Sequence, residues 1–180
     1  MIYLDHAAAT PLDPTVLAAM QPYLVEKFYN PSSPYAPAVA VRREYEAAKS
    51  AIAAVIGARS GELIMTAGAT ESINLAFGSR SGHVVTTVIE HQSVLAAAAR
   101  HEHTLVPVDH NGRVDLNEIK KAIRSDTWLV SVGLANNEIG TIQPLNKIAE
   151  LLATVRNERL ASGNTTPIYL HSDASQGAGQ

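Results

Sequence analysis

The 180-residue sequence contains no cysteine. This absence excludes disulfide bonds, thiolate metal ligands and any thiol chemistry carried by the chain itself. Long apolar runs are missing as well, since none approaches the roughly 20 residues that a helix needs to cross a bilayer. The first six residues lack the basic and apolar regions of a secretory signal peptide. We therefore expect a cytoplasmic protein with no membrane partner.

An excess of charge of either sign is also lacking. The 14 lysine and arginine residues nearly balance the 17 aspartate and glutamate residues, which gives a formal net charge of -3. Without a basic excess, a nucleic-acid partner is not expected. Hydrophobic residues make up 46% of the sequence and charged residues 17%. This is the composition of a globular domain with a hydrophobic core.

The order of apolar and polar segments predicts an α/β fold with a mostly parallel sheet. Helices are predicted over residues 14–27, with Asp13 as N-cap, 37–56, 70–77, 91–100, 115–124 and 144–160. Strands are predicted over residues 62–66, 83–89, 104–108, 127–134 and 167–171. From Glu62 onward the two types alternate. Several strands are continuously apolar, as expected for strands that are buried on both faces.

Ligands of such sheets bind beyond the carboxyl ends of the strands. This rule selects four loops, which begin at Thr66, Glu90, Ala135 and His171. Each of them carries polar or glycine-rich sequence. We therefore look for the site in these four loops.

The first loop leads through Gly68 directly into a predicted helix. Free backbone N–H groups and the helix dipole favour an anion such as phosphate there, and Thr70 can add its hydroxyl. The alternative is that Thr70 is an ordinary helix N-cap. In the second loop, His91 can lie flat against an aromatic ligand, act as a base or bind a metal. The alternative is a helix-capping or surface histidine.

The third and fourth loops add a neutral donor and a carboxylate. Asn137 can hold a ligand hydroxyl or phenolate, and the alternative is a turn built from asparagine and glycine. Asp173 ends an apolar strand, so its carboxylate stays charged only beside a cationic or hydrogen-bonding partner. A protonated pyridine nitrogen is one such partner, and it makes the ring an electron sink. The alternative for Asp173 is a helix N-cap.

Together these groups fit a phosphorylated pyridine better than a nucleotide. The sequence contains neither a G-x-G-x-x-G fingerprint after a first strand nor a G-x-x-x-x-G-K-[ST] loop. A metal site is the other option for the histidines, because His101 and His103 alternate along a predicted strand near His110. No cysteine or carboxylate completes a ligand set at a suggestive spacing, so no metal is predicted.

These loops resemble those of the cysteine desulfurases, which are class V pyridoxal-phosphate (PLP) enzymes of fold type I. The matching stretches occur in the family's order and are residues 3–11, 30–33, 66–72, 90–91, 136–140 and 171–176. The resemblance implies the three-layer large domain of that fold, truncated before its last strands and its small C-terminal domain. We expect an N-terminal segment and helix over residues 1–30, a partial PLP-binding large domain over residues 31–180, and no C-terminal domain.

The resemblance also implies which residues hold the cofactor. Ala69 and Thr70 are expected to bind the PLP phosphate. Asn137 and Gln176 are expected to contact the side of the ring that carries the 3-hydroxyl group. Asp173 is expected to pair with the pyridine nitrogen.

The implied reaction removes sulfur from L-cysteine and leaves L-alanine and an enzyme persulfide. His91 is expected to stack on the pyridine ring and to take part in proton transfer. The sulfur of this family usually serves iron–sulfur cluster or thio-cofactor synthesis, so a sulfur-acceptor protein is a further expected partner. We also expect either a homodimer or a complementary C-terminal half.

The sequence departs from the family in two functional groups. The family's Schiff-base lysine follows a Ser-x-His-Lys motif downstream of the Asp173 match, and its persulfide cysteine lies later still. None of the five lysines here stands in that context; they are Lys27, Lys49, Lys120, Lys121 and Lys147. We therefore expect PLP to bind noncovalently at most and the chain alone to be inactive.

Two alternative functions remain open on the sequence. One is a different class V PLP enzyme, such as a selenocysteine lyase or an aminotransferase. The other is a noncatalytic fragment of the PLP fold that acts as a binding module.

Overall fold

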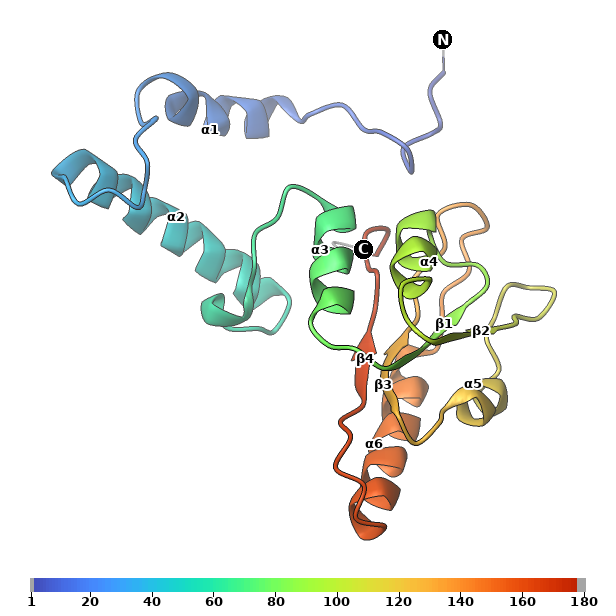
Figure 1. Cartoon of the computed structure of the whole chain (residues 1–180). Coiled ribbons are helices and arrows are strands. Elements are labelled where there is room, and N and C mark those ends of the chain that lie inside the picture. Colours follow the sequence, from blue (N-terminus) through green and yellow to red (C-terminus); the bar gives the residue numbers. More distant parts are fainter. Residues whose placement is uncertain (1, 178–180) are drawn as a thin grey trace. The chain divides into compact units, whose positions relative to one another are not determined.

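The computed structural model describes residues 2–177 of the chain. It contains two compact units, one up to Met65 and the other from Thr66 onward. Figure 1 shows the helices and strands of both units along the sequence. Within the described residues, none of the helices has the length and the apolar character that a bilayer crossing requires.

The N-terminal unit consists of two helices and a short 3-10 turn. Helix α1 spans Pro14–Val25 and helix α2 spans Ala36–Val55, and the 3-10 turn covers Ser60–Glu62. The predicted start of α1 is confirmed, because Asp13 Oδ1 accepts the backbone N–H of Thr15 at 2.7 Å. Such a cap satisfies one of the N–H groups that the first turn of a helix leaves without a partner.

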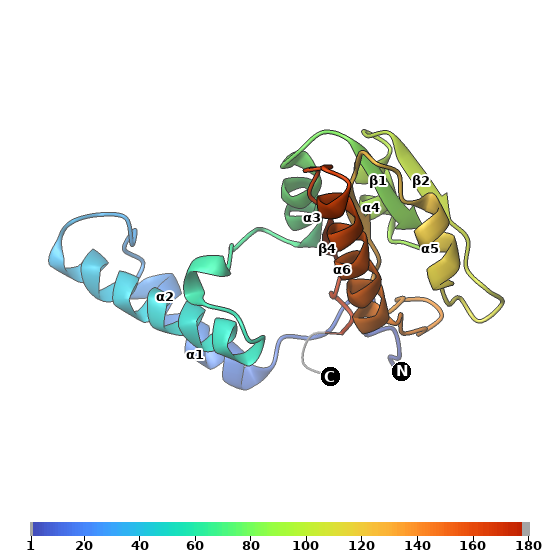
Figure 2. The ribbon, with the colours of Figure 1, turned by 90° about the horizontal axis from the view of Figure 1, so that it is seen from below.

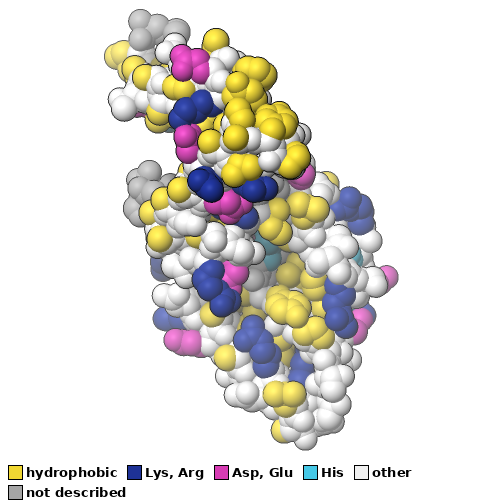
Figure 3. All heavy atoms as spheres, turned by 90° about the vertical axis from the view of Figure 1, so that its left-hand side faces the viewer, with side chains coloured by type: hydrophobic (Ala, Val, Ile, Leu, Met, Phe, Trp, Pro, Cys, Tyr) yellow, Lys and Arg dark blue, Asp and Glu magenta, His cyan; other side chains and the backbone are white. Residues whose placement is uncertain are grey.

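Polar contacts join the two helices of this unit. Glu44 of α2 accepts the hydroxyl of Tyr23 at 2.6 Å and the ammonium of Lys27 at 2.8 Å. The hydrogen bond from Lys27 lowers the pKa of Glu44. Apolar burial is small by comparison, since α1 buries none of its residues and large hydrophobic side chains of both helices are exposed. Figure 3 shows hydrophobic side chains gathered on the surface of this unit.

The predicted strand over residues 62–66 is wrong. Residues 63–66 form no regular secondary structure and pair with no strand in the described part of the chain, and Ile64 is 74% exposed. A strand is stable only when a neighbour completes its row of backbone hydrogen bonds. The apolar composition of this segment therefore did not suffice to form one.

The second unit alternates helices and strands as predicted. Its helices are α3 (Ala69–Gly78), α4 (Gln92–Ala98), α5 (Leu116–Ala122) and α6 (Leu145–Ala161). Its strands are β1 (His83–Thr87), β2 (His103–Val106), β3 (Thr127–Ser131) and β4 (Tyr169–His171). The strands form one sheet in the order β2-β1-β3-β4, and all neighbours are parallel. The predicted α/β fold with a parallel sheet is confirmed.

Helices cover both faces of this sheet (Figures 1 and 2). Val84 and Leu129 pack in one cluster with α3 and α4, whereas Val85 and Val130 pack in a second cluster with α5 and α6. Neighbouring residues of a strand point to opposite faces, so a strand that is covered on both sides must be apolar throughout. This explains the continuous apolar runs of β1 and β3.

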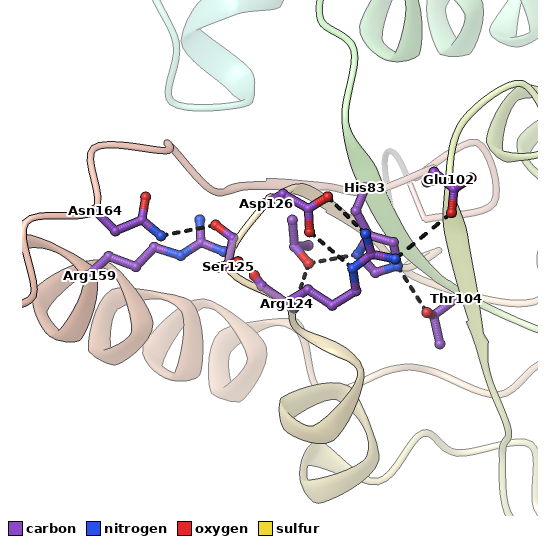
Figure 4. Close-up of polar contacts among 9 residues, drawn as sticks. His83, Glu102, Thr104, Arg124, Ser125, Asp126, Arg159 and Asn164 are labelled. Atoms are coloured by element: carbon purple, nitrogen blue, oxygen red, sulfur yellow. Dashed lines mark hydrogen bonds and ion pairs between the residues drawn. The ribbon is translucent and has the colours of Figure 1, made fainter.

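A buried histidine joins the strands at the amino edge of the sheet (Figure 4). His83 Nδ1 lies 2.7 Å from Thr127 Oγ1, and His83 Nε2 lies 2.9 Å from Thr104 Oγ1. Thr127 Oγ1 also accepts the backbone N–H of Arg124 at 2.7 Å, so its hydroxyl hydrogen can be donated to Nδ1. Arg159 of α6 donates to the Arg124 carbonyl at 2.7 Å and fixes the same corner. This network suits a neutral imidazole with its hydrogen on Nε2.

The His83 site predicts that stability falls in mild acid. Burial lowers the pKa of His83 below its ordinary value of 6.5, and the charge of Arg124 adds to this. The unfolded chain therefore takes up a proton at a higher pH than the folded chain. The stability contribution of the neutral ring is complete above about pH 6.5 and is lost as the pH falls below it. Urea unfolding at about pH 7.5 and about pH 5.5 measures this loss.

Two variants isolate the contribution of His83. His83→Gln carries no titrating ring, so its free energy of unfolding is expected to fall less between the two pH values than that of the unmodified chain. His103→Gln removes an exposed ring from the neighbouring strand and is expected to keep the full fall. Equal pH dependence of His83→Gln and the unmodified chain would contradict this account.

Candidate functional site

Three loops meet at the carboxyl edge of the sheet, where the parallel strands β1, β3 and β4 end. The N–H of Leu134 donates to the carbonyl of Asp173 at 2.9 Å, so the loops after β3 and β4 continue the pairing of their strands. The side-chain amide of Asn136 donates to the carbonyl of Ile89 at 2.9 Å and joins the loop after β3 to the loop after β1. The three loops are therefore one connected region.

Glu90 is a residue of this region whose contacts the sequence did not predict. Its Oε1 accepts the Thr87 hydroxyl at 2.7 Å, and both of its carboxylate oxygens lie 3.0 Å from the N–H of Gly133. Burial raises the pKa of Glu90, and the charge of Asp173 adds to this, while the two hydrogen bonds oppose it. The sequence signal is a glutamate shortly after a buried strand, but the sequence does not reveal that β1 lies beside β3.

His91 is the N-cap of α4. Its Nδ1 accepts the backbone N–H of Ser93 at 3.2 Å and lies 2.7 Å from the Ser93 hydroxyl. The helix-capping alternative is therefore confirmed. The capping bond places the hydrogen of a neutral ring on Nε2, and the side chain remains exposed. Capping is compatible with the stacking and proton-transfer roles of His91, which stay predictions.

The loop after β3 is the asparagine–glycine turn that was the alternative for Asn137. Asn136 Oδ1 accepts the N–H groups of Glu138 and Ile139 at 2.9 and 3.0 Å, and Gly140 has a φ of 70°. These residues complete the turn without the side chain of Asn137. That side chain is exposed and makes no hydrogen bond within the described residues, so its amide is available to a ligand.

Asp173 is partly buried just after β4. Its Oδ1 accepts the N–H of Ser175 at 3.0 Å and the Ser175 hydroxyl at 2.6 Å. Its Oδ2 has no hydrogen bond in the described part of the chain. Within residues 172–177 these bonds close a turn rather than cap a helix, and Gln176 lies exposed in the same turn. Among residues 2–177, no group therefore occupies the Oδ2 position of Asp173, and a ligand could bind there.

His171 is the titratable group nearest to Asp173 along the strand. Its Nδ1 lies 2.9 Å from Ser131 Oγ, and its ring packs edge-on against Phe77 with 5.5 Å between the ring centroids. Burial lowers the pKa of His171, although the charge of Asp173 opposes the shift. Near neutral pH this histidine is therefore uncharged and provides no cation for Asp173.

The first turn of α3 offers unpaired backbone donors. Its N-cap is Gly68, which has no side chain to cap the helix, so the alternative that Thr70 is the N-cap is wrong. The N–H groups of Ala69 and Thr70 donate to no acceptor within the described residues. Helix α3 leads into β1 over a short connection, and Figure 1 shows its first turn at the end of the unit toward which the strands run. Such a turn attracts anions.

The histidines of the metal alternative do not gather into a ligand set. His103 Nδ1 lies 2.9 Å from the backbone carbonyl of His101, and the His101 ring packs near Trp128. Among residues 2–177, no group of three or more histidine, cysteine, aspartate or glutamate side chains is placed to hold an ion.

The donor set at the carboxyl edge fits a phosphorylated pyridine. It combines free N–H groups for an anion, an exposed imidazole, an exposed amide and a carboxylate without a cation. A protonated pyridine nitrogen would supply the missing charge at Asp173. The same set offers little to a divalent metal, which prefers several converging carboxylates or imidazoles.

Comparisons with known proteins agree with this chemistry. The sequence profile described as aminotransferase class-V matches residues 2–162. The chain is 40% identical to the cysteine desulfurase IscS of Dictyoglomus turgidum over 99% of its own length and 45% of that protein. A solved NifS-like protein matches with a TM-score of 0.84 and 33% identity over 96% of this chain and 48% of that protein. SspA, solved in complex with cysteine, matches with a TM-score of 0.87 and 30% identity over 97% of this chain and 51% of that protein. The chain thus spans about half the length of these relatives.

Proposed function

The chain belongs to the aminotransferase class-V family, and from this premise we propose that it is the N-terminal part of a PLP-dependent cysteine desulfurase. The complete enzyme would convert L-cysteine to L-alanine and an enzyme persulfide. Its division into an N-terminal segment over residues 1–30, a large domain from residue 31 and a separate C-terminal domain belongs to the same proposal. So do its cytoplasmic location and its assembly as a homodimer.

The observation that carries this proposal is Asp173 at the end of β4. Asp173 is a partly buried carboxylate whose Oδ2 has no hydrogen bond within residues 2–177 and whose neighbour His171 is uncharged near neutral pH, so the site can accommodate a cationic partner. In the family that the chain belongs to, the PLP pyridinium is such a partner. When bound, PLP supplies an electron sink for the charge that develops at the substrate α-carbon.

The residues of this chain have separate tasks in that reaction. The N–H groups of Ala69 and Thr70 would hold the phosphate at the first turn of α3. Asp173 would keep the proton on the pyridine nitrogen, and the Asn137 amide would hold the 3-hydroxyl side of the ring together with Gln176.

The exposed ring of His91 would stack on the pyridine and transfer a proton at Nε2, because Nδ1 is engaged with Ser93.

We expect this chain by itself to form no measurable alanine from L-cysteine. It contains no cysteine to accept sulfur and no lysine in a Ser-x-His-Lys context to act at the α-carbon. The measurement is alanine formation by the purified 180-residue chain with added PLP, compared with free PLP alone. A rate clearly above that of free PLP would contradict the expectation, and the lysines listed above would then be the first residues to replace.

A different class V activity is the second candidate. The solved structure of SspA contains cysteine, which favours cysteine over selenocysteine or a keto acid as the substrate here. Comparing L-cysteine, L-selenocysteine and an amino donor as substrates of the complete enzyme distinguishes these activities. A protein that accepts the sulfur of the persulfide remains part of the proposal, as does a complementary C-terminal half.

A further inference from the structure

Glu90 ties together two loops that are far apart in the sequence. The carboxylate is partly buried between β1 and β3, where it receives the Thr87 hydroxyl and the Gly133 N–H. Gly133 permits this approach, because a Cβ atom at that position would lie only 3.1 Å from Glu90 Oε2. The side chain therefore bridges the ends of two neighbouring strands rather than pointing into solvent.

A second hydrogen-bonded tie joins the same pair of loops. The Asn136 amide donates to the carbonyl of Ile89, the residue before Glu90. The backbone N–H of Leu134 then donates to the carbonyl of Asp173 and extends the connection to the loop after β4. The loops after β1, β3 and β4 are thus held together by hydrogen bonds. These bonds use the side chains of Glu90 and Asn136 and the backbone, but not the side chains of His91, Asn137 or Asp173.

We propose that Glu90 is a positioning residue, and that with Asn136 it holds His91, Asn137 and Asp173 in their places at the carboxyl edge. Glu90 directly precedes His91, and Asn136 directly precedes Asn137, so each tie fixes the backbone next to a group that faces the ligand. The inference rests on the proposed function, because PLP is the ligand that gives the three groups a common task.

The length and shape of the Glu90 side chain decide whether the tie can form. Glutamine has the same length and one acceptor oxygen, which can accept from both Thr87 and Gly133 as Oε1 of Glu90 does, so Glu90→Gln keeps a weaker, uncharged form of the tie. Aspartate is one methylene shorter and cannot reach Gly133 from the same backbone, so Glu90→Asp breaks the tie although the charge is kept. Glu90→Ala removes the tie altogether. Glu150→Ala is the matched control, since this glutamate is exposed on α6.

The experiment follows amide hydrogen exchange and the ring nitrogens of histidine by NMR in the 180-residue chain. In Glu90→Ala and Glu90→Asp, the Gly133 amide is expected to exchange at least about tenfold faster than in the unmodified chain, as loss of a hydrogen bond to a charged group implies. The chemical shifts of the His91 ring nitrogens are expected to change from those of the tautomer with its hydrogen on Nε2 toward those of a mixture of both tautomers. Glu150→Ala is expected to resemble the unmodified chain in both measurements, and Glu90→Gln is expected to lie between the unmodified chain and Glu90→Asp, because a neutral acceptor forms a weaker hydrogen bond.

The outcomes separate this inference from the proposed function. Unchanged Gly133 exchange and an unchanged His91 ring in Glu90→Asp would overturn the positioning role. If Glu90→Ala speeds the exchange of all core amides, the comparison of Glu90→Gln with Glu90→Asp still decides, because both keep most of the buried volume. Titration of the unmodified chain with PLP tests the proposed function separately. If amide exchange follows the expected pattern but the chain binds no PLP, the positioning role of Glu90 stands and the proposed cofactor site fails.

Discussion

Replacing Asp173 with alanine is expected to raise the dissociation constant of the chain for PLP by about a hundredfold, because a buried charge pair that loses one partner costs about 2–5 kcal/mol. Oδ2 of Asp173, which has no hydrogen bond within residues 2–177, is the atom that the pyridinium would meet, and His171 beside it is uncharged near neutral pH. The change is measured by titrating the chain with PLP and following the absorbance of the bound cofactor. Asp173→Asn is expected to bind weakly as well, since an amide does not hold the pyridine proton.

Asp126→Ala is the control for the loss of an aspartate. Asp126 pairs with Arg124 at 2.9 Å at the amino edge of the same sheet, away from the three loops. Its removal is expected to leave PLP binding unchanged. Equal binding by Asp173→Ala and the unmodified chain would contradict the cofactor role of Asp173. If only Asp126→Ala lost PLP binding, the cofactor would bind at the amino edge of the sheet and not at the carboxyl edge.

Phe77→Ala is expected to lower the free energy of unfolding by about 3–5 kcal/mol, the usual cost of removing a buried aromatic ring. Phe77 is fully buried in the cluster between α3, α4 and the sheet, and its ring is the surface against which His171 packs. The loss is measured by urea or thermal unfolding followed by circular dichroism. The same substitution frees the His171 ring, so weaker PLP binding is expected to accompany the lower stability.

Phe28, the other phenylalanine of the chain, provides a matched control. Phe28 is 67% exposed and stacks on the ring of Tyr29. Phe28→Ala is expected to change the free energy of unfolding by about 0.5 kcal/mol or less, as for most surface substitutions. A loss in Phe77→Ala as small as that in Phe28→Ala would contradict the role of Phe77 in the core of the second unit.

The sequence predicted most of the fold because its local signals and its burial pattern agree. Asp13 marks the start of α1, and the continuous apolar runs of β1 and β3 mark strands that are covered on both faces. The strand predicted over residues 62–66 failed because composition reveals an apolar segment but not whether a partner strand is available. Strand pairing depends on the whole sheet, and a local window does not contain it.

The candidate site was predicted only in part for a related reason. The loops that carry His91, Asn137 and Asp173 were found, because the carboxyl ends of parallel strands are the usual ligand edge. The tie from Glu90 to Gly133 was missed, because it depends on β1 and β3 being neighbours although β2 lies between them in the sequence. Thr70 was the alternative N-cap of α3, but the structure has Gly68 there. The sequence could not decide between them, because threonine and glycine are about equally favoured at an N-cap.

The central claim is that this chain is the N-terminal part of a PLP-dependent cysteine desulfurase. Native mass spectrometry of the chain isolated from the cells that produce it, with PLP retained, tests this most directly. The account predicts that the chain is found joined to or bound by further polypeptide that carries PLP on a lysine, and that this material forms alanine from L-cysteine. A lone 19.1 kDa chain that is folded but takes up no PLP would contradict it.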